Sequence, residues 1–235
     1  MSQRNNKQAG FSLIELIIAM TLTLTVMGIA TTLLAQALNV RTRTNANNDA
    51  LADAQRALNI MSREMANSGF NLTGNGIVSG DTGTDANGNS MIRFRANTNK
   101  FDTSVSTAAR NGIGVLGEDA GEDVKYFVHQ ANNTNLLARY DEYGKAGGSV
   151  TVLANRLDNL HMHYYGQRVT YGTSGCDLTG ASASEVAPTA AKYVVIAVCV
   201  KLGAVGSPGS AGYQPEKSVL LLSDVALRNS NLTVY

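Results

Sequence analysis

The sequence predicts an α+β protein in which one long amino-terminal helix precedes a head built on an antiparallel sheet. Two observations predict the helix: residues 11–38 are almost continuously apolar, and an apolar residue then recurs every three or four positions as far as residue 65. A third predicts the sheet, because short strand-like segments follow with no helix of ten or more residues between them. The 235 residues suffice for one ordinary domain with an appendage.

The composition argues against several classes of function. Lys and Arg number 19 against 18 Asp and Glu, a net charge of +1, so the chain as a whole is not built to coat nucleic acid or anionic lipid. Three His and 2 Cys argue against a metal cage with many ligands. The glycines of residues 112–117 neither follow a strand nor open a helix, so they do not form a dinucleotide-binding loop. We therefore expect no enzyme, cofactor, bound metal or small-molecule substrate.

The first apolar segment is long enough to cross a membrane. No residue between Glu15 and Arg41 is charged, and residues 16–40 at ~1.5 Å per residue span the ~30 Å hydrocarbon core of a bilayer. Arg4 and Lys7 precede the segment, which by the positive-inside rule leaves the amino end in the cytoplasm and exports the head. The polar stretch that follows lacks the small-residue cleavage site of a secretory signal peptide, so we expect the helix to remain.

Glu15 is the unusual residue of this segment. An ionised carboxylate inside hydrocarbon costs at least ~2.5 kcal/mol and usually marks function, so Glu15 requires a partner. The alternative is a carboxylate that lies near the membrane interface and extends into water.

The string GFSLIEL at residues 10–16, after a short basic leader, resembles the processing motif of type IV prepilins and type II secretion pseudopilins. The resemblance implies that a prepilin peptidase cleaves after Gly10 and that the new terminal residue, Phe11, is N-methylated. It also implies that Glu15 pairs with the terminal amine of a neighbouring subunit, so that the two buried charges compensate each other. Losing one partner of such a pair costs ~3 to 5 kcal/mol, which makes Glu15 a candidate for the control of subunit assembly.

Beyond the membrane segment, the sequence predicts that the same helix continues in amphipathic form. The apolar stripe has spacings of 3, 4, 3 and 4 and consists of Leu51, Ala54, Leu58, Met61 and Met65. We interpret the stripe as core packing against the sheet, and Gly69 as the stop of a helix that runs from about Ser12 to Ser68. The expected segments are a cleaved leader at 1–10, a transmembrane and filament-core helix at 11–40, its amphipathic continuation at 41–69, and a periplasmic head at 70–235.

The head begins with a region rich in Gly, Asn, Asp, Ser and Thr that is mostly loop as far as residue 121. Its strand candidates, whose spacing suits antiparallel hairpins, are Met91–Arg95, Val124–His129, Asn135–Tyr140, Val150–Leu153, Leu157–Tyr165, Tyr193–Val200 and Ser218–Ala226.

Three head segments extend the resemblance. Residues 54–65 with 68–70 are similar to the helix end of PilW-type minor pilins, and residues 225–229 also resemble that pattern. Residues 152–165 resemble a strand entry shared by PilW-type pilins and GspJ-type pseudopilins. The membrane segment lacks the proline common in major pilins, which favours a minor subunit.

Other clusters of polar residues have simpler interpretations. Cys176 and Cys199 lie in the exported part and would close a loop of 22 intervening residues, so we expect a disulfide, the alternative being two buried thiols. The acidic stretch Asp81–Asn89 lacks the terminal Glu of a calcium loop and is expected to be a surface turn. His161 and His163 share a strand face without a third ligand nearby in sequence, so we expect solvent-facing residues.

The resemblance implies a structural function: a minor pilin that primes or caps a type IV pilus. Its expected partners are the prepilin peptidase, other minor and major pilins, and the bacterial inner membrane, with the head in the periplasm before the subunit enters the pilus. One alternative is a GspJ-like pseudopilin of a type II secretion system. Another is a tip-displayed adhesin or DNA-binding pilin, but Lys100, Arg110, Lys125 and Arg139 are scattered in sequence, so no nucleic acid is expected.

Overall fold

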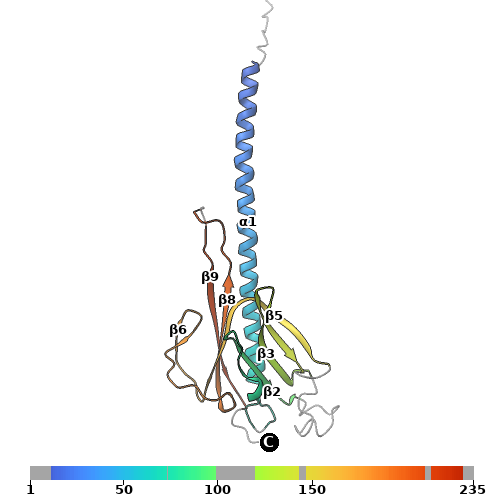
Figure 1. Cartoon of the computed structure of the whole chain (residues 1–235), viewed down its shortest axis with the longest axis vertical. Helices are drawn as coiled ribbons and strands as arrows, with labels where there is room; N and C mark the ends of the chain where they lie inside the picture. Colours follow the sequence, from blue (N-terminus) through green and yellow to red (C-terminus); the bar gives the residue numbers. More distant parts are fainter. Residues whose placement is uncertain (1–11, 73, 99–119, 143–146, 210–212, 230–235) are drawn as a thin grey trace, which may run out of the picture.

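One long helix packed on a main antiparallel sheet dominates the described part of the chain, as the sequence predicts. The structure is a computed structural model that describes residues 12–72, 74–98, 120–142, 147–209 and 213–229. Helix α1 (Leu13–Ala66) contains 54 residues, and its upper half stands clear of the head while its lower half lies within it (Figure 1). At ~1.5 Å per residue the helix is about 80 Å long.

The ends of α1 follow from local hydrogen bonding. Ser12 is the extended residue before the first turn, and its backbone N–H donates to Glu15 Oε2 at 3.4 Å. At the other end the N–H of Asn67 donates to the carbonyls of Glu64 and Met65, which tightens the last turn and ends the helix two residues before the expected Ser68. Gly69 has φ +76°, and a Cβ there would lie 2.3 Å from the carbonyl oxygen of Gly74, so this position requires glycine.

The main sheet has seven strands in the order β1-β2-β3-β4-β5-β8-β9, and every neighbouring pair is antiparallel. Its strands are β1 (Gly83–Thr84), β2 (Ser90–Arg95), β3 (Asp123–Ala131), β4 (Thr134–Asp141), β5 (Ser149–Tyr165), β8 (Tyr193–Leu202) and β9 (Lys217–Ala226). Strands β6 (Gly172–Ser174) and β7 (Asp177–Thr179) form a separate hairpin, and two short 3-10 helices are η1 (Ser79–Asp81) and η3 (Pro188–Ala190).

The strands expected at Val150–Leu153 and Leu157–Tyr165 are not separate, which corrects the sequence-based assignment. They are two parts of β5: the first part pairs with β4, and the part from Leu157 onward pairs with β8. The register shifts where the partner changes, and Arg156 lies there with φ +57°. An irregularity in one continuous strand, rather than a loop, therefore separates the two apolar patterns.

The core lies between the lower half of α1 and the sheet. The buried helix residues are Ala50, Ala54, Ala57, Leu58, Met61 and Met65. They pack with residues from β2, β3, β4, β5, β8 and β9, among them Ile92, Tyr126, Leu137, Leu160, Ile196 and Val225. The expected apolar stripe is confirmed as core, except that Leu51 is only partly buried. A smaller cluster of Tyr165, Val169, Tyr193 and Val195 packs with residues of the β6–β7 segment.

Candidate functional site

The upper half of α1 exposes apolar side chains along its whole length. The exposed large apolar residues are Leu13, Ile14, Leu16, Ile17, Ile18, Met20, Leu22, Leu24, Val26, Met27, Ile29, Leu33, Leu34 and Leu38. By length and composition this helix can cross a membrane, and none of its most apolar window is buried inside the protein. A surface of this kind requires lipid or other helices around it in order to be shielded from water.

The threonines of this half satisfy their own hydroxyl groups. Each of the five donates to a backbone carbonyl three or four residues earlier in α1, at 2.7 to 3.0 Å: Thr21, Thr23, Thr25, Thr31 and Thr32. A hydroxyl that is bonded within its own helix costs less to transfer into hydrocarbon than a free one. In sequence these threonines are recognisable only as polar residues in an otherwise apolar run, and the run itself does not indicate these bonds.

Glu15 is the only charged residue between residues 12 and 40, and its contact within α1 is the N-terminal capping box with Ser12. The carboxylate is on the exposed first turn and accepts the single weak hydrogen bond from the Ser12 N–H at 3.4 Å. Arg41, the next charged residue along α1, follows 41 minus 15, or 26, residues later, which is about 39 Å along the axis. The cleavage and methylation residues Gly10 and Phe11 lie outside the described residues.

In the head, an ion-pair cluster fastens the end of α1 to the sheet. Glu64 of α1 accepts hydrogen bonds from the Tyr126 hydroxyl on β3 and from Arg139 Nε on β4, the latter at 3.0 Å. Arg139 also donates from Nη1 to Asp141 at 3.0 Å. Burial, and then the charge of Glu64, raises the pKa of Tyr126 far above its ordinary range, so this hydroxyl stays a donor.

The acidic stretch at residues 81–89 is occupied by contacts within the protein. Asp81 pairs with Arg93 Nη1 at 2.5 Å and Lys125 Nζ at 3.2 Å, and the hydrogen bond from Arg93 is the main cause of the lowered pKa of Asp81. The Asp85 carboxylate accepts the backbone N–H groups of Asn87 and Asn89, both at 2.8 Å. These contacts are those of a structural turn, in agreement with the expectation from sequence.

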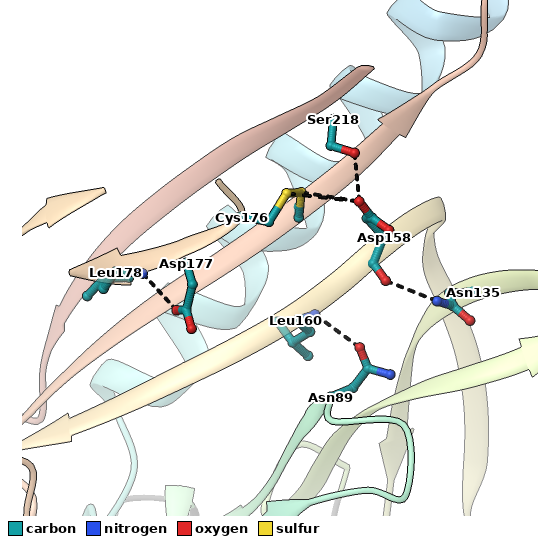
Figure 2. Close-up of a disulfide and its surroundings, with 9 residues drawn as sticks. Asn89, Asn135, Asp158, Leu160, Cys176, Asp177, Leu178 and Ser218 are labelled. Carbon is teal, nitrogen blue, oxygen red and sulfur yellow. Dashed lines mark hydrogen bonds between the residues drawn. A yellow bond between two sulfur atoms is a disulfide. The ribbon is translucent and has the colours of Figure 1, made fainter. Parts of the chain in front are cut away.

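The two cysteines meet at the side of the sheet. A disulfide joins Cys176, in the turn between β6 and β7, to Cys199 on β8, with 5.5 Å between their Cα atoms (Figure 2). Asp158 Oδ2 lies 4.0 Å from each sulfur and accepts from Ser218 Oγ at 2.6 Å. These three residues could hold a metal ion by their spacing alone, but sulfurs joined to each other are not thiolate ligands.

His163 is not a solvent-facing residue, which corrects the sequence-based interpretation. Its side chain is 16% exposed and lies between Asp177 and Glu185, each 2.7 Å from a ring nitrogen. Burial opposes the protonated form, but the hydrogen bonds to Glu185 and Asp177 outweigh it, so the pKa of His163 is raised. Glu185 comes from the segment before η3, and the sequence pattern gave no sign that it lies beside β5.

Two of the four basic residues that could contact nucleic acid are ion-paired within the protein. Lys125 and Arg139 form the ion pairs described above, and Lys100 and Arg110 lie outside the described ranges. The glycines of residues 112–117 also lie outside them.

Comparison with known families supports the resemblance found at the amino end. Residues 5–31 match the family model described as the prokaryotic N-terminal methylation motif. The match includes the string at residues 10–16 and much of the exposed apolar half of α1, and it supports a type IV pilin-like or pseudopilin protein. Comparison with curated proteins and with solved structures finds no match.

Proposed function

We propose that this chain is a minor pilin of the PilW type, a structural subunit that takes part in priming or capping a type IV pilus. The observation that carries the proposal is the exposed apolar half of α1 with Glu15 in its first turn, in the segment that matches the methylation motif. Such a helix fits a membrane-anchored pilin, and the motif implies processing by a prepilin peptidase and assembly with other pilins.

Maturation would create the positive charge with which the carboxylate of Glu15 is proposed to pair. Cleavage after Gly10 leaves 235 minus 10, or 225, residues and removes Arg4 and Lys7, so the net charge falls from +1 to −1. The new terminal amine at Phe11 would carry a positive charge in the bilayer. In a filament, Glu15 of one subunit and this amine of its neighbour would neutralise each other in a setting with little water.

Assembly would then proceed by exchange of surroundings. In the inner membrane, with the amino end in the cytoplasm and the head in the periplasm, α1 would be shielded by lipid. In the pilus its apolar half would be shielded by like helices, and the sheet and loops of the head would select the adjacent subunit. The ion-pair clusters of the head bind residues of the protein to each other, which supports a structural role for them.

The first experiment measures the intact mass of the chain purified from membranes with and without the prepilin peptidase. We expect loss of residues 1–10 and gain of one methyl group only when the peptidase is present. Retention of the leader in its presence would contradict the proposal.

The second measurement tests assembly with Glu15→Ala. We expect the variant to be processed and to keep the thermal unfolding midpoint of its head. Its recovery in sheared filaments should fall at least tenfold, because the terminal amine of the neighbouring subunit then finds no carboxylate partner. Glu15→Asp is the matched control that keeps the charge and should retain part of the recovery. Equal recovery of Glu15→Ala and the unmodified chain would contradict the role of Glu15.

A GspJ-like pseudopilin of a type II secretion system is the second candidate. Residues 152–165, which carry the likeness to both classes, form most of the bent strand β5. Crosslinking in the membrane separates the two: a pilin is expected to capture pilus subunits, and a pseudopilin the subunits of the secretion apparatus.

A further inference from the structure

A cavity of about 670 Å³ opens where α1 leaves its exposed apolar half and enters the head. Its walls come from α1, the turn between β3 and β4, the irregular part of β5, and the end of β8. The lining residues that matter here are Arg43, Asn47, Asn133, Arg156, Asp158 and Lys201. Because these residues lie far apart in sequence, no local motif could have indicated the cavity.

The cavity has an excess of positive charge. Three cationic side chains line it, Arg43, Arg156 and Lys201, against the one carboxylate of Asp158. That carboxylate is bonded to Ser218 Oγ at the disulfide side, as Figure 2 shows. Lys201 also pairs with Glu216 at 2.9 Å, but both side chains are more than half exposed, so water weakens this pair.

Two of the cationic residues have an unusual local setting: Arg43 is bonded to backbone carbonyls, and Arg156 has a positive φ. Arg43 Nη1 donates to the carbonyls of Ala204 and Gly206 at 3.3 and 3.4 Å, which fixes the guanidinium between α1 and the β8–β9 loop. Arg156 is exposed and has φ +57°, a conformation that glycine adopts without strain and arginine does not. Three of the other four non-glycine residues with positive φ are asparagines, the type that tolerates it best. Arg156 therefore occupies a strained position at the irregularity of β5, where it also lines the cavity.

The position of the cavity along α1 identifies its surroundings. The helix residues that line it run from Thr42 to Asn47, four to nine residues after Leu38, the last large exposed apolar residue of the helix. At ~1.5 Å per residue they lie about 6 to 14 Å beyond that apolar segment. With α1 in a bilayer, this is the outer part of the headgroup layer, which extends about 5 to 7 Å beyond the ~30 Å hydrocarbon core on each side and is within reach of long cationic side chains.

We propose that the cavity binds the phosphate-bearing headgroup of an anionic phospholipid while the subunit resides in the membrane. The inference rests on the proposed function, since it requires α1 to span a bilayer. A phosphate group would accept hydrogen bonds from Arg43 and Arg156 and face Lys201, with Asn47 and Asn133 at the polar wall. Binding would hold the head against the membrane surface, and transfer of α1 into a filament would remove the lipid.

The experiment uses the full chain reconstituted in nanodiscs of equimolar phosphatidylglycerol and phosphatidylcholine, extracted gently and weighed by native mass spectrometry. We expect retained phosphatidylglycerol to exceed phosphatidylcholine, and Arg156→Gln to reduce that ratio about fivefold, the effect of one surface cation near anionic lipid. Arg156→Lys should keep most of the ratio. The matched control is Arg63→Gln, an exposed arginine on α1 that is 63 minus 47, or 16, residues beyond Asn47 and should leave the ratio unchanged.

Three outcomes would overturn the site: no preference in the unmodified chain, an equal loss in Arg63→Gln, or binding of inorganic phosphate as tight as that of the lipid. Arg156→Gly separates binding from folding, because it should lose the lipid while its thermal unfolding midpoint stays the same or rises. A fall in that midpoint with the ratio intact would make Arg156 merely structural. Resistance of the protein to carbonate extraction is measured on the same samples, so a chain that inserts without lipid preference refutes only the cavity, and a chain that does not insert refutes membrane anchoring too.

Discussion

At the scale of single residues, Arg139 connects the end of α1 to strand β4. It joins Glu64 at the end of α1 to Asp141 on its own strand, and its side chain is only 15% exposed. Removing it would leave Glu64 and Asp141 partly buried without their cation. Such losses cost more than the net strength of the hydrogen bonds themselves, because the abandoned charges remain desolvated.

We expect Arg139→Gln to lower the free energy of unfolding by about 1 to 3 kcal/mol. The measurement is denaturant unfolding of the full chain in detergent, followed by the fluorescence of its tyrosines. The control is Arg56→Gln, at an exposed position on α1, which should change the free energy of unfolding by less than about 0.5 kcal/mol. Equal effects of the two substitutions would show that the cluster does not stabilise the head.

His163 gives the head a dependence on pH. Its folded pKa is raised by Glu185 and Asp177 against the effect of burial, so the protonated form is favoured by folding. This contribution is fully present below the unfolded value of about 6.5 and is lost as pH rises through the folded pKa. Because Asp177 and Glu185 are 43% and 51% exposed, screening limits it to about 1 kcal/mol.

We therefore expect the unmodified chain to exceed His163→Gln in stability at pH 5.5 and to lose that advantage by pH 9. Thermal unfolding midpoints of both proteins across this range measure it. Gln130→Ala, which removes no titratable group from an exposed position on β3, should keep a constant difference from the unmodified chain. An advantage of His163 that grew with pH would contradict the sign.

At the scale of elements, the disulfide attaches the small β6–β7 hairpin to strand β8 of the main sheet. Cys199 is buried, so a single substitution of Cys176 would leave a free thiol in the core. We expect the double substitution Cys176→Ser and Cys199→Ser to lower the free energy of unfolding by about 3 kcal/mol through the longer free loop in the unfolded chain.

Mass measurement after alkylation provides the check on the bond itself. The unmodified chain, unfolded without reductant, should take up no alkyl group, and with reductant it should take up one at each cysteine. Alkylation without reductant would mean that the loss of stability in the double variant has another origin.

The elements that the sequence predicts well are those with enough residues to display a period or an apolar cluster. Helix α1 shows an apolar period, as does the alternating strand β2, whereas β3, β4, β8 and β9 are recognised by their clusters of apolar residues, in β8 an unbroken run from Tyr193 to Val200. The three-residue strands β6 and β7 show neither, because alternation cannot be recognised in so short a segment. The single strand β5 was divided in two because its apolar pattern changes phase at Arg156, and a bulge has the same appearance in sequence as a short loop.

The candidate sites differ in the same way. Glu15 is visible in sequence because one carboxylate interrupts an apolar run. The Glu64 cluster is not visible, since Tyr126 and Arg139 lie 62 and 75 residues away along the chain. Contacts of this range depend on the strand order, which the pattern of polarity leaves open.

At the scale of the whole molecule, the head has a buried core, whereas among the described residues the upper half of α1 has none. The head buries its own core against the lower half of α1 and satisfies most of its charges internally, whereas the upper half of the helix has no covering within the part of the chain that the structure describes (Figure 1). The division at 11–40 and 41–69 was drawn from hydropathy, and the structure has no break in α1 there. The upper and lower parts of α1 thus form one continuous helix, and they differ in what surrounds them.

The hydroxyl groups of five threonines are hydrogen-bonded within α1, which bears on both the entry of α1 into a filament and its return to a bilayer under the proposed function. The five are Thr21, Thr23, Thr25, Thr31 and Thr32. In the proposed transfer of α1 from a bilayer into a filament, and in the reverse transfer, none of these hydrogen bonds would have to break. These five threonines would therefore add no desolvation barrier in either direction. If the chain assembles as proposed, α1 could leave a filament and re-enter a bilayer without rearranging these five side chains.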